Sequence, residues 1–222
     1  MRHTSLVLFS SLLIGLWAAN VCAQITLPPQ SDTQQWNDVS LAVPISKTVD
    51  FVLGGTVRNG RDITRPVDER VGVGFSFKVG KYLTVVPNYL HIEMQPFAGR
   101  KVLEERLSVA TTVKIPVRRF NVSDRNLFER RFRPLVDATR YRNRLQVDHP
   151  IGPTKHHISL FIADEVFYDW FFNAWVRNRF TVGATKVVNK HLTFDLYYLR
   201  QNDSHSFPGD LHVIGSAWRF HL

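Results

Sequence analysis

The sequence has very little cysteine and no second long apolar run. Its single cysteine, Cys22, lies close to the N-terminus, so the rest of the chain folds without disulfide bonds. After the first 23 residues no stretch approaches 18 consecutive apolar residues, which excludes membrane-spanning helices. If such a chain enters a membrane, the remaining architecture is a closed β-barrel, because every backbone polar group must be paired there.

The N-terminus predicts export. Arg2 and His3 precede an apolar run from Leu6 to Ala19, and the small residues Val21 and Ala23 follow it. This is the pattern of a secretory signal cleaved after Ala23. We therefore divide the chain into a signal peptide (1–23), an N-terminal segment that forms a short strand or lies in the lumen (24–35), and a barrel (36–222).

The formal net charge is +9. An exported β-protein does not routinely meet nucleic acid, and here Lys and Arg lie at the ends of the expected strands and between them. This placement indicates contact with the phosphates of membrane lipids. The alternative is that the charge only increases solubility.

Strict alternation of apolar and polar residues is the strongest positive signal. Between Glu69 and Val79, every second residue is Val or Phe and the others are Arg, Gly, Ser or Lys. Since side chains of a strand point alternately to its two faces, this predicts a strand with one apolar face. Eleven such segments follow one another from Trp36 onward. Further clear examples are Glu105–Ile115, Arg142–Val147, Arg177–Ala184, His191–Leu199 and Asp210–Leu222.

The connections alternate between short turns and longer polar loops, as in outer-membrane barrels. The expected turns are 44–47, 80–81, 116–119, 150–155 and 186–190, and the expected loops are 59–66, 95–101, 133–139, 169–173 and 203–209. We predict an all-β fold, an antiparallel up-and-down transmembrane β-barrel of ten to twelve strands. Twelve is favoured because bacterial single-chain barrels have even strand numbers, with 24–35 as a source of the twelfth.

The apolar face is expected to point outward into lipid. The polar face is rich in small residues such as Gly72, Gly74 and Ser108, which suit a crowded lumen. The apolar face carries Tyr89, Tyr198, Trp218 and Phe220 near strand ends, as in the aromatic girdles of membrane barrels. A soluble lipocalin-like barrel would have the opposite polarity.

The segment Phe120–Phe132 is the exception. Asp124, Arg125 and Asn126 put polar groups on both of its faces. A β-bulge there would reset the alternation.

Several short motifs resemble one family. They are Trp36-Asn37-Asp38, Arg65-Pro66-Val67-Asp68-Glu69-Arg70, Ser123-Asp124-Arg125-Asn126, Glu129-Arg130-Arg131, Arg140-Tyr141-Arg142-Asn143-Arg144, Asp164-Glu165-Val166-Phe167-Tyr168 and Leu199-Arg200-Gln201-Asn202. Over nearly the whole mature chain the sequence is similar to domain of unknown function 2490, a set of predicted bacterial outer-membrane barrels. The resemblance implies the fold and an outer-membrane location, and it implies no activity.

Arginine recurs on the polar face at each second strand, every 35–38 residues. The expected lumen charge cluster comprises Arg70, Arg106, Arg142, Arg144, Arg177 and Arg179, with Glu129, Asp164 and Glu165 as partners. Two interpretations remain open. The arginines line an anion-selecting constriction, or they form a structural salt-bridge network, since unpaired buried charge is costly.

A second group of cations lies in the expected loops or at their ends and is a candidate for binding lipopolysaccharide phosphates. It comprises Arg58, Arg61, Arg65, Arg100, Lys101, Arg130, Arg131 and Arg133. The alternative is that these residues belong to ordinary solvated loops.

Catalytic patterns are weak. His212 and Ser216 are four residues apart on one strand, too far for proton transfer, and Asp203, Ser204 and His205 are adjacent in a loop. His156-His157 has no ligand spacing typical of a metal site. We expect no enzyme activity, cofactor or metal.

The favoured function is a small anion-preferring channel or a structural barrel in the bacterial outer membrane. The alternatives are a lipid-modifying outer-membrane enzyme (lipase or deacylase) and a soluble periplasmic ligand-binding barrel. Expected partners are outer-membrane lipids, lipopolysaccharide and the assembly machinery, which would read the C-terminal strand ending in Leu222. The sequence does not indicate the oligomeric state.

Overall fold

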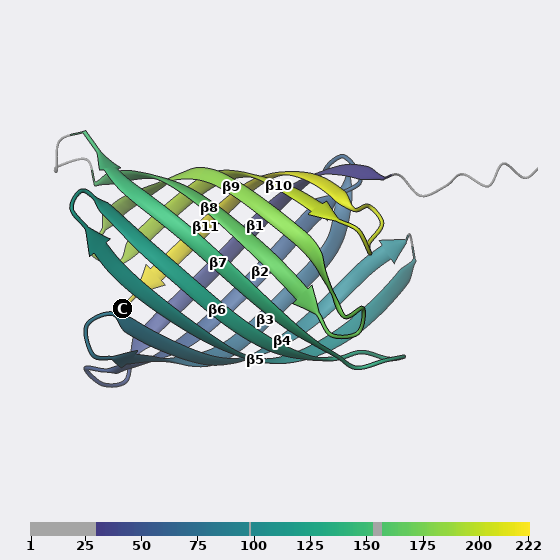
Figure 1. Cartoon of the computed structure of the whole chain (residues 1–222), viewed down its shortest axis with the longest axis horizontal. Coiled ribbons are helices and arrows are strands. Elements are labelled where there is room, and N and C mark those ends of the chain that lie inside the picture. Colours follow the sequence, from purple (N-terminus) through teal and green to yellow (C-terminus); the bar gives the residue numbers. More distant parts are fainter. Residues whose placement is uncertain (1–29, 98, 153–156) are drawn as a thin grey trace, which may run out of the picture.

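The computed structural model describes residues 30–97, 99–152 and 157–222. Eleven strands form one closed, strongly tilted barrel (Figure 1). In chain order they are β1 (Ser31–Pro44), β2 (Val49–Gly60), β3 (Arg65–Val79), β4 (Leu83–Phe97), β5 (Arg100–Val117), β6 (Phe120–Phe132), β7 (Ala138–Ile151), β8 (Ile158–Asp169), β9 (Ala174–Asn189), β10 (Leu192–Asp203) and β11 (Asp210–His221). In those described ranges no helix is long and apolar enough to cross a membrane.

The barrel closes through a parallel pair, so the prediction of twelve strands is wrong. β1 and β11 run in the same direction, in a register from Ser31 opposite Asp210 to Ala42 opposite His221. All other neighbours are antiparallel. Residues 31–35 extend β1 instead of adding a strand, and residues 24–29 lie outside the described residues. An odd number of up-and-down strands leaves the first and last strands parallel, with Ser31 and His221 at opposite ends of the barrel.

The strands run further than the alternation pattern predicted. We call the end with connections 61–64, 98–99, 133–137, 170–173 and 204–209 the loop end, and the opposite end, where β11 finishes, the turn end. Both ends have connections of two to six residues, so the predicted difference between short turns and long loops is wrong. Residues 95–97 and 100–101, expected in a loop, belong to β4 and β5, since hydrogen bonding between them continues to the Phe97–Arg100 pair.

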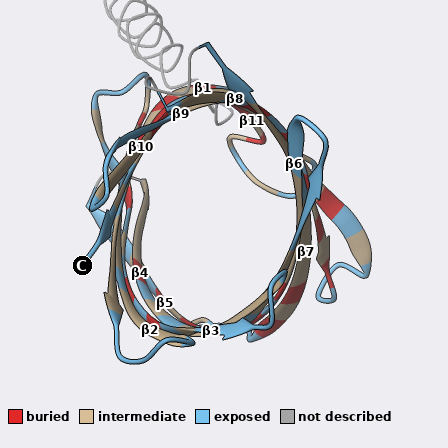
Figure 2. Ribbon diagram, turned by 90° about the vertical axis from the view of Figure 1, so that its left-hand side faces the viewer, coloured by how far each residue is buried: buried red, intermediate tan, exposed pale blue. Residues whose placement is uncertain are grey.

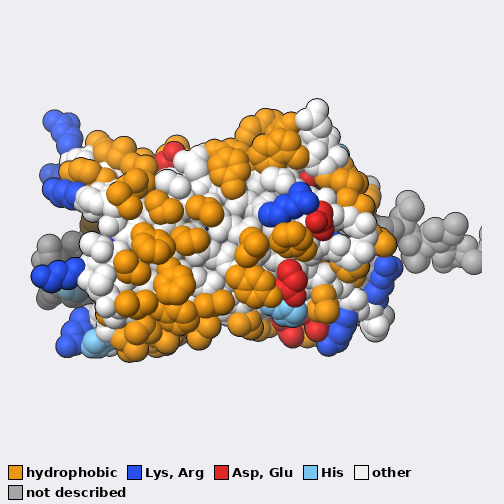
Figure 3. Space-filling model, turned by 90° about the horizontal axis from the view of Figure 1, so that it is seen from below, with side chains coloured by type: hydrophobic (Ala, Val, Ile, Leu, Met, Phe, Trp, Pro, Cys, Tyr) orange, Lys and Arg blue, Asp and Glu red, His pale blue; other side chains and the backbone are white. Residues whose placement is uncertain are grey.

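The apolar face points outward, as predicted. Val71 is 60% exposed, and Phe75, Leu107 and Ile162 are also exposed. Buried residues such as Arg106 and Glu129 contact each other inside the barrel instead, and Figure 2 shows buried and exposed stretches of ribbon alternating around the ring. Figure 3 shows apolar side chains covering one side of the barrel, with Lys and Arg gathered at the turn end on its left. This polarity is wrong for a soluble ligand-binding barrel, because a soluble barrel buries its apolar side chains in the centre.

β6 contains no bulge. Its register with β5 and with β7 is unbroken, so the expected resetting of the alternation is wrong. Arg125 faces the lumen, where it contacts Glu165, whereas Asp124 and Asn126 face outward together with Phe128. The two polar faces that the sequence indicated are therefore both present.

A small apolar cluster lies inside the barrel beside the parallel seam. Trp36 of β1, Leu199 of β10, and Leu211 and Val213 of β11 are all buried there, and Tyr197 packs against them. The remaining lumen at this level is charged. The seam that closes the barrel is thus supported by apolar packing in addition to its backbone hydrogen bonds.

Candidate functional site: an arginine-rich lumen

The predicted lumen residues, with one exception, lie on the inner wall towards the loop end. Arg70, Arg106, Arg142, Arg144, Arg177, Arg179, Glu129 and Glu165 all project inward. Direct ion pairs there join nine arginines to six carboxylates, namely Arg58, Arg70, Arg106, Arg125, Arg131, Arg140, Arg142, Arg177 and Arg179 with Asp68, Glu104, Glu129, Glu165, Asp169 and Asp203.

Glu129 is one centre of this network. It accepts hydrogen bonds from Arg106 Nη1 (2.9 Å), Arg140 Nε (2.7 Å) and Arg142 Nη1 (3.2 Å). These donors come from β5 and β7, the two strands on either side of β6. The buried carboxylate therefore ties three neighbouring strands together by charge-assisted hydrogen bonds.

Glu165 and Glu104 are the other two centres. Glu165 Oε1 accepts from Arg125 Nη2 (2.7 Å) and Arg142 Nη2 (2.8 Å). Glu104 is fully buried and accepts from Arg131 and Arg106. Glu104 shares Arg106 with Glu129, and Glu165 shares Arg142 with it. The ion pairs of these three carboxylates therefore form one connected layer across β5–β9.

Aromatic rings complete the layer. The guanidinium carbon of Arg58 lies 3.7 Å from the centre of the Trp36 ring, and that of Arg179 lies 4.9 Å from it. Phe167 is fully buried, with Arg142 at 4.6 Å and Arg179 at 4.8 Å from its ring centre. Such contacts stabilise desolvated cations beyond their ion pairs.

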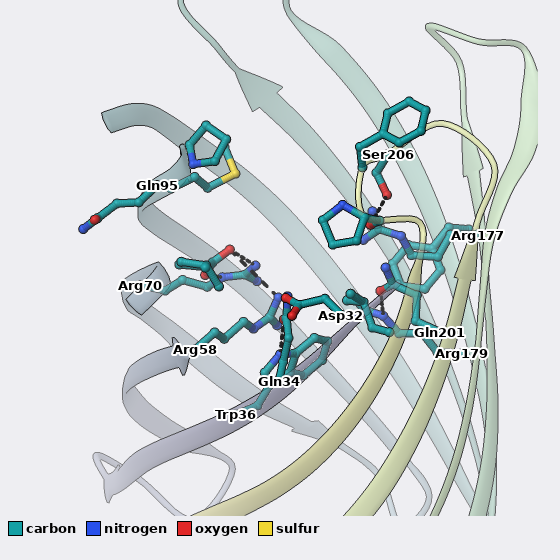
Figure 4. Close-up of a pocket in the computed structure, with 18 of the residues that line it drawn as sticks. Asp32, Gln34, Trp36, Arg58, Arg70, Gln95, Arg177, Arg179, Gln201 and Ser206 are labelled. Carbon is teal, nitrogen blue, oxygen red and sulfur yellow. Dashed lines mark hydrogen bonds and ion pairs between the residues drawn. The ribbon is translucent and has the colours of Figure 1, made fainter. Parts of the chain in front are cut away.

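This layer narrows the lumen between two cavities. The loop-end cavity has a volume of about 230 Å³ and includes Arg70, Gln95 and Ser206 in its lining (Figure 4). The turn-end cavity has a volume of about 400 Å³ and includes Arg144 and Tyr197. The residues that line both cavities are Trp36, Arg58, Arg142 and Arg179. We call these four residues the constriction.

Positive charge is in excess at the constriction and just beside it, in the lining of the turn-end cavity. Arg58 reaches Asp68 only at 3.9 Å and Arg179 reaches Glu165 only at 3.8 Å. Arg144 donates to the uncharged Gln146 Oε1 (3.0 Å) and has no carboxylate partner within the described residues. These three arginines are therefore only weakly neutralised by carboxylates.

Asp164 is the exception, and its predicted position in the lumen is wrong. It projects from the outer face of β8 and accepts a hydrogen bond from Asn178 Nδ2 (2.9 Å). The reason is geometric. Asp164 and Glu165 are adjacent in one strand, so only one of them can face inward.

Two of the predicted lipid-phosphate residues also belong to the lumen. Arg58 and Arg131 lie within β2 and β6, and their side chains turn inward to Asp68 and Glu104. Arg61 contributes to the loop-end cavity and donates to the Pro96 carbonyl oxygen. The other five, Arg65, Arg100, Lys101, Arg130 and Arg133, lie at the loop-end rim or in the 133–137 connection.

The sequence reasoning missed Asp68, Glu104, Arg125, Arg140, Asp169, Asp203 and Trp36. A usable signal was present for Asp68 and Glu104. Each stands two residues before a predicted arginine, Arg70 and Arg106, and therefore on the same face of the same strand. Both carboxylates accept hydrogen bonds from that arginine.

The weak catalytic patterns do not assemble into a relay. Ser204 Oγ lies 2.7 Å from His205 Nδ1, but Asp203 accepts from the His205 backbone nitrogen and from Arg177 instead of orienting the ring. His212 contacts Tyr198 and Arg200, while Ser216 donates to Asn37.

No metal-binding group was found either. Among residues 30–97, 99–152 and 157–222, no three His, Cys, Asp or Glu side chains are placed to hold a metal ion. His156 lies outside these ranges.

Together these features define a class of protein: an outer-membrane-type β-barrel with an apolar outer belt and an ion-paired lumen. The chain belongs to the family described as "Protein of unknown function (DUF2490)", whose model matches residues 33–210. No curated protein matches the sequence.

Three solved structures are similar to this chain at low sequence identity. The NanC porin is 12% identical with a TM-score of 0.48, covering 82% of this chain and 93% of the porin. LpxR from Salmonella typhimurium is 10% identical with a TM-score of 0.46, covering 78% of this chain and 83% of LpxR. The anion-selective porin from Comamonas acidovorans is 11% identical with a TM-score of 0.42, over 80% of this chain. This chain spans 55% of that porin's length.

Proposed function

We propose that this protein is a bacterial outer-membrane channel whose constriction favours small anions. The excess of arginine in the constriction and just beside it carries the proposal. A purely structural network would balance its charges, since each unpaired buried cation costs free energy. Here Arg58, Arg144 and Arg179 are only weakly neutralised, and rings of arginine are a common means of selecting anions in pores.

Single-channel recording in planar bilayers tests this proposal. Under a KCl gradient the reversal potential should have the sign of an anion-selective pore. Arg144→Ala should lower the anion-to-cation permeability ratio roughly sevenfold. One unit charge about 7 Å from a passing ion in a water-like medium changes the energy of an anion and that of a cation by about 0.6 kcal/mol each, in opposite directions. Because Arg144 has no carboxylate partner within the described residues, this change leaves the ion pairs intact.

Arg130→Ala is the matched control. Arg130 faces outward and is paired with Asp137 (3.1 Å), so its removal should leave the selectivity unchanged. A cation-selective pore, or an Arg144→Ala variant with unaltered selectivity, would contradict the assignment. Absence of any conductance from the correctly folded barrel would leave a structural role.

We also propose that cations of the loop-end rim contact lipopolysaccharide phosphates. Arg130 and Arg133 lie there beside exposed aromatic side chains, with Arg133 5.9 Å from the Phe171 ring centre. Guanidinium groups next to an apolar surface suit a lipid phosphate above its acyl chains. Less lipopolysaccharide should then co-purify with the double variant Arg130→Ala/Arg133→Ala than with Lys81→Ala at the turn end. Equal amounts would refute this contact.

A further inference from the structure

A row of polar side chains crosses the lipid-facing surface of β6–β9. Asn143 Nδ2 donates to Asp124 Oδ1 (2.6 Å) and to Asn126 Oδ1 (3.2 Å), and Asn126 Nδ2 donates to Asp124 Oδ2 (3.2 Å). The Asn178–Asp164 hydrogen bond continues the row on β8 and β9. We call these five residues the polar ladder.

The polar ladder lies within the apolar belt and not at its edge. On β6, exposed Phe128 lies towards the loop end and exposed Phe120 towards the turn end. On β8, exposed Ile162 and Leu160 follow Asp164 towards the turn end. Hydrocarbon offers these amides and carboxylates no hydrogen bonds. In the described part of the chain, neither Asp124 nor Asp164 has a basic partner.

The ladder retains unused hydrogen-bonding groups of both kinds. Asn126 Nδ2 carries two hydrogens and makes one hydrogen bond, to Asp124. Asp164 accepts through Oδ1, and Oδ2 accepts nothing from the described residues. A donor on β6 and an acceptor on β8 are thus free, on the two strands that flank β7.

These two groups lie at about the same depth in the membrane. The pairing register leads from Asn126 through Asn143 to Val166. Because the strands are tilted, this line rises towards the loop end between β6 and β8 (Figure 1). Asp164 is two residues closer to the turn end than Val166, which brings it back to the depth of Asn126.

We propose that this face binds a second copy of the chain across a two-fold axis parallel to the barrel axis, which passes in front of the outer face of β7 at the level of the ladder. Such an axis places β6 of one copy against β8 of the other, so that Asn126 faces the partner's Asp164 twice. A two-fold interface requires a self-complementary patch, and the ladder supplies donor and acceptor at matching positions. In helical membrane proteins, hydrogen bonds between amide side chains hold neighbouring segments together, and the same chemistry is available here. Leu145, 49% exposed on β7, provides apolar contact beside the axis.

Cysteine cross-linking in membranes tests the interface directly. In a Cys22→Ser background, Leu145→Cys should form a covalent dimer with a short bismaleimide. Leu196→Cys on β10 is the matched control, because both leucines face outward, are 49% and 53% exposed, and lie seven residues from the loop end of their strands. We expect roughly tenfold more cross-linked dimer from Leu145→Cys than from Leu196→Cys. A specific interface would bring two copies of residue 145 together about ten times as often as random encounters bring two copies of residue 196 together.

Asn126→Leu supplies the second test. It removes the donor and leaves the lumen unchanged, and it should weaken dimerisation several-fold in the Leu145→Cys background, measured as the cross-linked fraction against protein density. Heat-modifiable gel migration confirms that each variant is folded. Equal cross-linking of Leu145→Cys and Leu196→Cys, or cross-links from Leu145→Cys only to other proteins, would overturn the proposal. These results do not depend on whether the lumen conducts.

Discussion

The two halves of the lumen are built from different side chains. Towards the loop end the wall carries arginines, buried carboxylates and the rings of Trp36 and Phe167. Towards the turn end it carries small residues such as Gly74 and Ala110, with isolated pairs such as Lys78 and Asp50. The strands are continuous through both halves. The identity of the inward-facing side chains, and not the backbone geometry, therefore places the charged layer near the loop end.

The largest effect is expected from breaking the loop-end network at its centre. Glu129→Gln leaves Arg106, Arg140 and Arg142 without their shared negative charge, and removing one partner of a buried pair costs about 3–5 kcal/mol. Denaturant unfolding of the protein in vesicles measures this loss. Glu105→Gln, on the exposed outer face of β5, should cost far less, because exposed charge pairs contribute little to stability. Equal stability of the two variants would show that the network is not a structural centre.

An intermediate effect is expected at a closely packed glycine of the turn-end half. A Cβ atom on Gly74 would lie 2.5 Å from the Pro87 carbonyl oxygen, whereas on Gly54 its nearest neighbour is 3.7 Å away. Gly74→Ala should therefore cost about 1–3 kcal/mol through overpacking. Gly54→Ala, also on the lumen face, is the control and should be nearly neutral in the same unfolding measurement. A neutral Gly74→Ala would mean that β3 and β4 separate easily.

The smallest effect is expected at the turn-end rim. Lys78 Nζ lies 2.8 Å from Asp50 Oδ2, but the lysine side chain is 48% exposed. Exposed ion pairs contribute about 0–1 kcal/mol and are screened by salt. Lys78→Ala should accordingly change the free energy of unfolding by less than Glu129→Gln, and the difference from wild type should disappear in high salt. A larger, salt-independent loss would mean that the two halves are not distinct.

Local alternation predicted most of the lumen wall. Arg70, Arg106, Arg142 and Arg179 were found because each stands on the polar face of a regular strand. Asp164 was misplaced because the alternation within β8 was not applied to its neighbour Glu165. Arg58 and Arg131 were assigned to loop ends because pairing extends β2 and β6 beyond the segment where apolar residues alternate.

The ion pairs themselves could not be predicted. Glu129 meets Arg106 and Arg140, which are 23 and 11 residues away in the sequence, and Arg125 reaches Glu165 across 40 residues. These contacts depend on the register between neighbouring strands, which a single sequence does not fix when strand ends are uncertain.

The order of residues alone determined that this chain is all-β, that its apolar side chains face outward and that arginines face inward, because side-chain direction in a strand follows from position within two residues. Only the tertiary structure decided that eleven strands close through a parallel β1–β11 pair and which arginines share a carboxylate. Closure and cross-strand pairing join segments from opposite ends of the chain, and no local pattern carries that information.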